Sequence, residues 1–199
     1  GSNLVFAEEL IEDARHIEVQ ILGDGHSCIH LFERDCSFQR NFQKFIEFCP
    51  APNLKTQTKE KLYNYAIVLC QSVGYKGLGT VEFLVDKNEK IYFMEVNPRV
   101  QVEHTITEEL TGIDLIRAQI NVFCGLSIQD QKLSEVQISG KRASIQARLN
   151  MESYDNKLQL VPATGTIKEY DIASGPGIRV DDAGTVGLEN NGLYDSLLA

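Results

Sequence analysis

The segment between Thr80 and Asn97 constrains the fold of this chain more than any other. Two runs rich in β-branched and aromatic residues, Thr80–Val85 and Lys90–Asn97, flank a polar cluster at 86–89, and this pattern predicts a β-hairpin. Because side chains alternate along a strand, one face collects apolar residues that we expect to be buried: Val81, Phe83, Val85, Tyr92, Met94 and Val96. The opposite face collects polar residues: Glu82, Glu95 and Asn97.

The pairing across this hairpin depends on its loop. A loop closed on residues 87–88 places Glu82 opposite Phe93, whereas a loop of four residues places Glu82 opposite Glu95. In both cases two carboxylates share one face, and their repulsion favours an added proton or a cation between them. Oxygen ligands from these carboxylates and Asn97 suit Mg²⁺ or Mn²⁺ rather than zinc. The alternative is an outer face of scattered, solvated charges.

Polar side chains continue beyond the hairpin at alternate positions, Arg99, Gln101 and Glu103. A guanidinium beside a carboxylate can hold a small planar oxyanion while the carboxylate accepts a proton. The alternative is an Arg99–Glu103 ion pair that only holds a loop. The spacing favours neither interpretation over the other.

Hydrophobic periodicity and turn residues predict the remaining elements. We expect strands at His16–Leu22 and Cys28–Glu33, a mixed segment at Arg34–Lys44, an extended one at Phe45–Phe48, and helices from Thr56 to Gly74 and over Ile113–Cys124. Thr105–Glu108 resembles a capping box, and Gly77-Leu78-Gly79 predicts a tight turn rather than a nucleotide loop. After residue 141, short alternating runs such as Gly177–Val180, separated by Pro and Gly, predict a second, mostly antiparallel β region with a boundary near 135–140.

Composition narrows the partners and the compartment. The chain has 199 residues, is 43% hydrophobic and carries a formal net charge of −9, so it can bury a core and is a poor partner for nucleic acid. No apolar run reaches membrane-spanning length. The five cysteines are odd in number, widely spaced and without a CxxC pair, which favours reduced thiols in a cytoplasmic compartment over disulfides or a zinc site.

One string identifies a family resemblance. M-E-V-N-P-R-V-Q-V-E-H-T-I-T-E, at Met94–Glu108, closely resembles the signature of biotin carboxylases, which belong to the ATP-grasp superfamily. Other segments match the same family in the same order: Arg15–Gln20, Glu33–Ser37, Gln39-Arg40, Gly77–Phe83, Ile145–Asn150, Gly177–Asp181 and Tyr194–Leu198. Matches along nearly the whole chain make chance similarity very improbable.

The resemblance implies a fold and a reaction. The fold is of the α+β class: the C-terminal part of an ATP-grasp fold, an antiparallel sheet with helices, over residues 3–137, and then the mostly antiparallel β start of the biotin carboxylase C-terminal domain over 138–199. In such enzymes ATP activates bicarbonate as carboxyphosphate, and the CO₂ released is trapped by N1 of biotin on a carrier domain.

The same resemblance implies partners and a wider context. A carboxyltransferase domain or subunit then passes the carboxyl group to an acceptor, as in acetyl-CoA, acyl-CoA, pyruvate or urea carboxylases. The acceptor and self-association of the intact enzyme stay open, and a eukaryotic parent would be compatible with the mitochondrial matrix. No nucleic acid and no membrane is expected among the partners.

Site residues follow from the resemblance position by position. The metal ligands match Glu82, Glu95 and Asn97, in agreement with the hairpin argument. The bicarbonate-holding segment matches Arg99, Gln101 and Val102, the general base Glu103, the biotin-enolate arginine Arg148, and a lysine facing the anionic substrate Lys44. The adenine hinge matches Glu8, Glu9, Leu10 and Ile11, with His16 and Gln39 near the nucleotide.

The chain departs from the family pattern in three respects. Asn41 and Phe42 replace an arginine and a histidine, and Glu9 replaces a frequent lysine. From the resemblance we expect a piece without the family's N-terminal domain and glycine-rich lid, and Gly1-Ser2 is expected to be a cloning scar. We therefore expect a fragment with little or no activity alone. Two alternatives stay open: another ATP-grasp carboxylate-amine ligase, which should lack the Arg99–Glu103 string and Arg148, and a non-catalytic scaffold or subunit-contact module.

Overall fold

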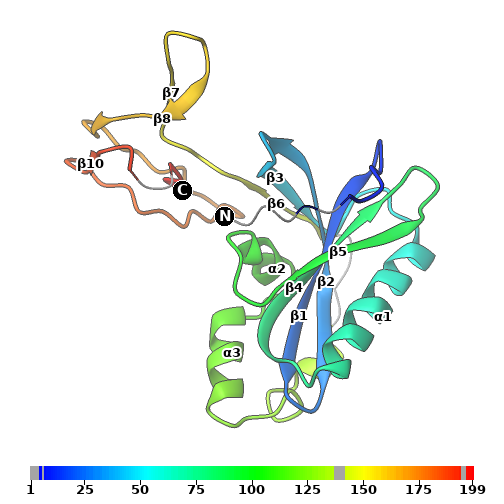
Figure 1. The fold of residues 1–199 in the computed structure, drawn as a ribbon. Helices are drawn as coiled ribbons and strands as arrows, with labels where there is room; N and C mark the ends of the chain where they lie inside the picture. The colour runs from blue at the N-terminus through cyan, green and yellow to red at the C-terminus, as the bar shows by residue number, and fades with distance from the viewer. Residues whose placement is uncertain (1–4, 6, 137–141, 194–195) are drawn as a thin grey trace. The chain divides into compact units, whose positions relative to one another are not determined.

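The computed structural model describes residues 5, 7–136, 142–193 and 196–199 (Figure 1). The chain divides into two compact units, Gly1–Gln146 and Ala147–Ala199. Two predictions lie outside the described residues, namely the cloning scar at Gly1-Ser2 and the boundary between residues 137 and 138.

A six-stranded sheet forms the centre of the first unit, in the order β5-β4-β1-β2-β3-β6. Its strands are β1 (Arg15–Asp24), β2 (Cys28–Arg40), β3 (Gln43–Cys49), β4 (Lys76–Val85), β5 (Ile91–Asn97) and β6 (Ser144–Ala147). The pairs β1–β2, β1–β4, β2–β3 and β4–β5 are antiparallel. The predicted α+β fold with an antiparallel sheet is therefore confirmed.

Helices cover both faces of this sheet. Helix α1 (Thr56–Ser72) contacts β1 and β2 on one face, while α2 (His104–Thr111) and α3 (Leu115–Phe123) lie on the other (Figure 1). A 3₁₀ turn, η1, follows at Leu133–Glu135. The carboxylate of Asp114 caps α3 by accepting from the backbone N–H of Arg117, which satisfies one of the free donors at a helix start. Among the described residues, none of the helices is long and apolar enough to span a bilayer.

The two faces separate apolar from polar side chains. The α1 face is apolar and buried, with contributions from β1, β4 and α1: Ile17, Val19, Ile21, Val81, Phe83, Val85, Leu62, Ala66 and Cys70. On the other face, one end packs against α3 through a second apolar cluster: Leu22, Leu31, Leu78, Leu115, Ala118 and Val122. The remainder of that face, next to α2, carries ionisable side chains, and the strand alternation decides which residues these are.

The predicted β4–β5 hairpin is confirmed, with Glu82 paired to Glu95. The pairing arises from a register shift between Glu82 and Phe83, because Phe83 pairs with Phe93 and Met94 is the extra residue of β5. The shift also reverses the alternation along β5. Met94 is 44% exposed and Tyr92 is only half-buried, so the prediction that these two residues are buried with Val81 was wrong. Val96 was predicted to be buried as well; it packs against the core but is also only half-buried.

The predicted mixed segment at Arg34–Lys44 was also wrong. Strand β2 continues to Arg40 and turns directly into β3 through Asn41 and Phe42, whose φ angles are 52° and 61°. Positive φ at both loop residues is the geometry of a two-residue hairpin turn. This turn contains no glycine, which is the residue that usually marks such a turn in a sequence. This hairpin brings Gln39 and Lys44 opposite each other.

Gly77-Leu78-Gly79 is part of β4 rather than the predicted turn. A Cβ at Gly79 would lie 2.6 Å from the Tyr75 hydroxyl oxygen, so this glycine permits a close approach of side chain to backbone. The predicted capping box was wrong as well. Helix α2 begins at His104 with Glu103 at its N-cap, and Thr105 inside the helix donates from its hydroxyl to Gln146.

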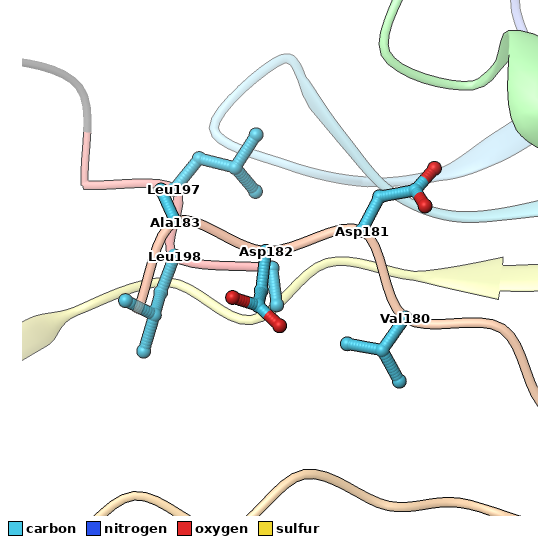
Figure 2. A pocket seen from close by; sticks show the side chains of 7 residues that line it. Val180, Asp181, Asp182, Ala183, Leu197 and Leu198 are labelled. Carbon is cyan, nitrogen blue, oxygen red and sulfur yellow. The ribbon is translucent and has the colours of Figure 1, made fainter. Parts of the chain in front are cut away.

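The second unit is built from short antiparallel pairs, as predicted. Strand β7 (Glu152–Tyr154) pairs with β8 (Leu160–Pro162), and β9 (Gly165–Thr166) pairs with β10 (Glu189–Asn190). The predicted run at 177–180 forms no strand. A pocket of this unit, shown in Figure 2, is lined by two carboxylates and aliphatic groups: Val180, Asp181, Asp182, Ala183, Leu197, Leu198 and Ala199.

Candidate functional site

A row of charged residues crosses the sheet on the face opposite α1. Backbone pairing aligns Glu95 with Glu82, Glu82 with Glu18, and Glu18 with Arg34, so four neighbouring strands each contribute one member. Glu18 and Arg34 are fully buried, and Glu82 is 4% exposed. Buried charges destabilise a fold unless they are paired and hydrogen-bonded. The stability of this face therefore depends on the ion pairs and hydrogen bonds that these charged residues make.

Lys44 lies at the centre of the cluster. Its ammonium donates to Glu18 Oε2 at 2.5 Å, to Glu82 Oε1 at 2.9 Å and to Glu103 Oε1 at 2.7 Å, which engages all three of its N–H donors. Burial alone would lower the pKa of Lys44, but the surrounding carboxylates, Glu18 foremost, raise it above its ordinary value. Lys44 was predicted to face an anionic substrate; in this structure it faces three carboxylates of the protein.

Arg34 is the second buried cation. Its Nε donates to Glu18 Oε1 at 2.5 Å, and its Nη1 donates to Gln20 Oε1 at 2.7 Å and to Thr107 Oγ1 at 2.9 Å. Burial would lower its pKa, and the charges of Glu18 and Glu103 raise it instead. Arg34 thereby joins β1 to α2 through charge-assisted hydrogen bonds.

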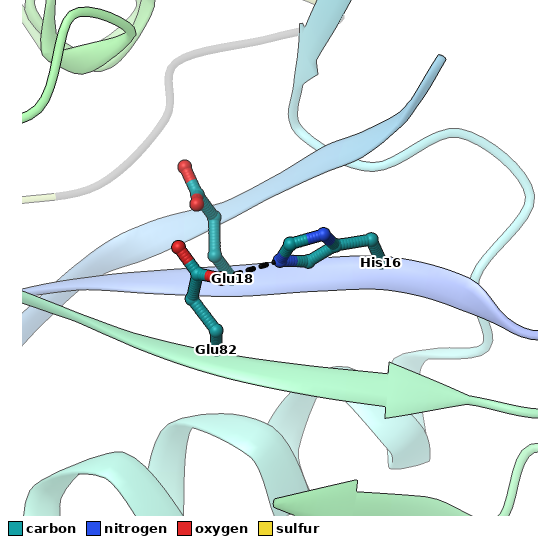
Figure 3. Close-up of side chains that lie close together, drawn as sticks. All are labelled: His16, Glu18 and Glu82. Carbon is teal, nitrogen blue, oxygen red and sulfur yellow. Dashed lines mark hydrogen bonds and ion pairs between the residues drawn. The ribbon is translucent and has the colours of Figure 1, made fainter. Parts of the chain in front are cut away.

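Glu82 accepts donors on both carboxylate oxygens. His16 Nε2 lies 2.7 Å from Oε2 (Figure 3), and Oε1 accepts from Lys44, from Asn97 Nδ2 at 3.0 Å and from Gln101 Nε2 at 2.9 Å. Burial would raise the pKa of Glu82, but the hydrogen bond to His16 and the charge of Lys44 outweigh it and lower the pKa. Glu82 is therefore a carboxylate at neutral pH.

Glu103 is 2% exposed at the start of α2. Burial would raise its pKa, but the charges of Lys44 and Arg34 lower it to about 2. A general base works best with a pKa near the operating pH. With Lys44 in contact, Glu103 is ionised but a weak base, so its basicity depends on where the Lys44 ammonium lies.

The three predicted metal ligands converge. Asn97 Nδ2 lies 3.0 Å from Glu82 Oε1 and 3.2 Å from Glu95 Oε1, so the amide bridges the two carboxylates. Glu18, Glu82 and Glu103 carry three negative charges against the two positive charges of Lys44 and Arg34, which leaves an excess of one before Glu95 is counted. Oxygen donors with surplus negative charge fit a hard divalent cation.

Further groups lie close enough to share an ion. The ligand atoms of His16, Glu18 and Glu82, drawn in Figure 3, lie within 4.8 Å of one another, and so do those of Glu18, Cys36 and Glu103. Lys44 already supplies a cation to all the carboxylates of both groups. The Glu82–Glu95–Asn97 set differs in that Glu95 is exposed and open to an incoming ligand.

The predicted bicarbonate segment lies beside this set. Arg99 is exposed; its Nη2 donates to Asn97 Oδ1 at 3.3 Å and its Nη1 donates to the Val100 carbonyl at 3.2 Å. Gln101 is buried between Glu82 and Arg34, whereas Val102 is 44% exposed. Glu103 pairs with Lys44, while the polar side chain that Arg99 contacts belongs to Asn97.

The predicted nucleotide residues fall into two groups. Gln39 Nε2 lies 2.7 Å from His16 Nδ1, which ties the β2–β3 hairpin to the Glu82 side chain through His16. The hinge residues precede β1 in an irregular segment, and their side chains are exposed except for one that is half-buried: Glu8, Glu9, Leu10 and Ile11. Arg148 belongs to the second unit.

Two central residues had no role in the sequence analysis. Glu18 and Arg34 lie inside segments that carried the family resemblance, yet both were left without an assignment. A signal existed for Glu18, because it stands in β1 between apolar Ile17 and Val19, where a lone carboxylate faces the side opposite the core. No comparable signal shows that Arg34 is its partner, because that pairing depends on the register of β1 against β2.

Comparisons with known proteins show the family to which this chain belongs. Residues 1–131 match the family model described as carbamoyl-phosphate synthase L chain, ATP binding domain. Pyruvate carboxylase of Aspergillus terreus is 44% identical over 200 residues, and mitochondrial pyruvate carboxylase of Homo sapiens is 46% identical over 200 residues. Each alignment covers 100% of this chain and 17% of the relative, so the chain spans less than a fifth of those proteins.

A solved structure extends the likeness to three dimensions. The biotin carboxylase domain of a single-chain bacterial carboxylase superposes with a TM-score of 0.85 at 42% sequence identity, covering 98% of this chain and 44% of that domain's chain. The fold of this chain thus has a counterpart among the solved structures.

Proposed function

This chain belongs to the family of the carbamoyl-phosphate synthase L chain ATP-binding domain, and we propose that it is the part of a biotin carboxylase that holds the divalent cation, bicarbonate and the general base. The intact enzyme would use ATP and bicarbonate to carboxylate biotin on a carrier domain. The observation that carries this proposal is the convergence of Lys44 with Glu18, Glu82 and Glu103 beside the Glu82–Glu95–Asn97 set.

Glu82, Glu95 and Asn97 would hold Mg²⁺ or Mn²⁺. A bound cation would neutralise charge on the ATP phosphates, which phosphoryl transfer requires. Glu95 is exposed and open to a ligand, whereas the carboxylate of Glu82 is held by hydrogen bonds to four side chains. Glu82 would therefore be the rigid ligand, and Glu95 the accessible one. His16 and Gln39, joined through their side chains, would line the nucleotide side, with Glu8, Glu9, Leu10 and Ile11 as the adenine hinge.

Arg99, Gln101 and Val102 would hold bicarbonate next to Glu103. The exposed guanidinium of Arg99 suits a planar anion, and Glu103 would accept the bicarbonate proton. The pKa of Glu103, about 2 while Lys44 is attached, implies that Lys44 must share its charge with the anion before this transfer is favourable. Lys44 would then pair first with Glu103 and afterwards with the bicarbonate anion.

The role of Arg148 and the domain bounds rest on the family resemblance. Arg148 would stabilise the enolate of biotin. Residues 3–137 would form the ATP-grasp part, and residues 138–199 the beginning of the C-terminal domain. The carrier domain and a carboxyltransferase domain or subunit would be the partners. The two pyruvate carboxylases are 44% and 46% identical to this chain, so pyruvate is a compatible acceptor.

The test uses the full-length enzyme that contains this chain. ADP release is measured with and without bicarbonate, for the wild type and for Glu103→Gln. We expect bicarbonate-dependent ADP release that Glu103→Gln reduces at least about a hundredfold, within the range that a general base contributes. ADP release that needs no bicarbonate and responds to an added amine would indicate another ATP-grasp ligase. No ATP cleavage under any condition would favour the scaffold alternative.

A further inference from the structure

The amide of Asn97 has an orientation that matters for the neighbouring sites. Its nitrogen donates to Glu82 Oε1 and Glu95 Oε1, and its oxygen accepts from Arg99 Nη2 at 3.3 Å. A carboxylate has no hydrogen to donate, so two carboxylates on one side require the NH₂ group there. Asn97 consequently turns its only oxygen away from the acidic pair and toward Arg99.

This orientation cannot persist when Asn97 binds a cation. An amide nitrogen carrying two hydrogens is not a ligand for Mg²⁺ or Mn²⁺, which take oxygen donors. For Asn97 to present its oxygen to a cation between Glu82 and Glu95, the amide must rotate. The rotation removes the acceptor that holds Arg99 Nη2, and it places the NH₂ group toward the like donors of the guanidinium, which is unfavourable.

A similar exchange applies to Lys44. Glu82 Oε1 accepts from Lys44, Asn97 and Gln101 in this structure, which exceeds the two lone pairs of a single oxygen. A divalent cation on that carboxylate competes with the ammonium for the same oxygen and repels it. Lys44 keeps its contacts with Glu18 and Glu103, so it gains a free N–H donor without leaving the cluster.

We propose that Asn97 and Lys44 couple the cation site to the bicarbonate site, so that each ligand tightens the binding of the other. This inference rests on the proposed function. Rotation of Asn97 releases the guanidinium of Arg99, and withdrawal of Lys44 from Glu82 frees an ammonium donor next to Glu103. Both released donors carry the positive charge that a bicarbonate ion requires, and in this structure each is bound to one member of the hydrogen-bonded Glu82–Asn97 pair. Asn97 is thus a positioning residue for Arg99 as well as a ligand.

The coupling is measured in the full-length enzyme with Mn²⁺ and bicarbonate as probes, without nucleotide. The dissociation constant of Mn²⁺ is obtained from the electron paramagnetic resonance signal of the free ion, with and without bicarbonate at neutral pH. The dissociation constant of bicarbonate is obtained by calorimetry, with and without Mn²⁺. We expect both constants to fall by the same factor, about fivefold or more, because binding linkage is reciprocal.

Two variants identify the route. Asn97→Asp offers an oxygen to the cation and another to Arg99 without rotation, so we expect it to bind Mn²⁺ while the coupling factor falls to the part that Lys44 contributes. Lys44→Gln removes the competing ammonium, so we expect Mn²⁺ alone to bind more tightly, an effect that a merely structural role would not give. Lys87→Gln, at an exposed position of the β4–β5 loop, is the matched control and should change neither quantity. Circular dichroism checks that each variant is folded.

The outcomes separate this inference from the function on which it rests. If Mn²⁺ binds in a manner that Glu82→Gln abolishes, but bicarbonate leaves its affinity unchanged, the coupling is refuted while the cation site stands. Coupling that survives intact in Asn97→Asp also refutes the proposed route. If Mn²⁺ does not bind, or binds equally well to Glu82→Gln, the cation site itself is wrong and the inference falls with it.

Discussion

The two faces of β1 and β4 are equally dry and chemically opposite. On the α1 face, Ile17 and Val81 have no exposed surface; on the opposite face, Glu18 has none and Glu82 has 4%. Of two adjacent residues in one strand, one therefore belongs to the apolar core and the next to the ionic cluster. Burial alone does not distinguish a core from a functional site, because both exclude water from their side chains.

The faces differ in what stabilises them. The apolar face gains free energy roughly in proportion to the area removed from water. The ionic face loses hydration at every buried charge, and it recovers that loss only where each charge finds partners. Lys44 and Arg34 provide these partners for Glu18, Glu82 and Glu103. We therefore expect the ionic face to fail abruptly when one partner is lost, and the apolar face to weaken gradually.

The largest effect is expected from Arg34→Met. It leaves Glu18 with one cationic partner in a dry environment, and breaking a buried pair in this way costs about 4 kcal/mol. Urea unfolding of the chain, followed by circular dichroism, measures the change. Arg117→Met, which removes an exposed arginine of α3, should stay within about 0.5 kcal/mol.

A companion substitution sharpens the comparison between the faces. Adding Glu18→Gln to Arg34→Met removes the buried charge that has lost its Arg34 partner, so the double variant should be more stable than Arg34→Met alone. A double variant that is less stable by the sum of both changes would show that packing, rather than charge pairing, dominates this face.

Acid should weaken the ionic face before the apolar one. The pKa of Glu103 is lowered from 4.5 to about 2 and that of Glu82 is also lowered. A depressed folded-state pKa contributes stability above the unfolded value near 4.5, and this contribution is lost as the pH falls toward 2. The part due to Glu103 is about 3 kcal/mol at most.

Unfolding free energies measured between pH 7 and pH 2 test this. The difference between wild type and Glu103→Gln should be largest at pH 7 and close toward pH 2. A difference that stays constant over that range would mean that Glu103 stabilises the fold without its charge.

The contrast between the faces was partly predictable from sequence. Alternation along Thr80–Val85 placed Glu82 opposite the apolar side correctly, because one buried face fixes the orientation of a strand. The pairing of Glu82 with Glu95 was one of two alternatives, and the register shift that produces it depends on local packing that no periodicity encodes. The same shift exposed Met94, which the alternation had assigned to the core.

The ionic cluster itself was not predictable as a unit. Lys44 was selected by family resemblance, but its three carboxylate partners come from β1, β4 and the start of α2, which are distant in sequence. Their meeting depends on the β2–β3 hairpin, whose turn at Asn41 and Phe42 lacks the usual glycine. Long-range ionic contacts require the whole topology, whereas strand faces require only a few neighbouring residues.

The smallest change in stability, with a large change in binding, is expected at the exposed edge of the ionic row. Glu95→Gln removes an exposed carboxylate of β5 whose partner is Asn97, so stability should change by less than about 0.5 kcal/mol. Mn²⁺ binding should weaken at least about tenfold, because a cation ligand is lost. Ile17→Val gives the opposite result: it removes one methylene from the apolar face, costs about 1 kcal/mol and leaves Mn²⁺ binding unchanged. Equal Mn²⁺ binding by the Glu95→Gln variant and the wild type would show that Glu95 is not a cation ligand. The exposed edge of the ionic row would then have no role in cation binding.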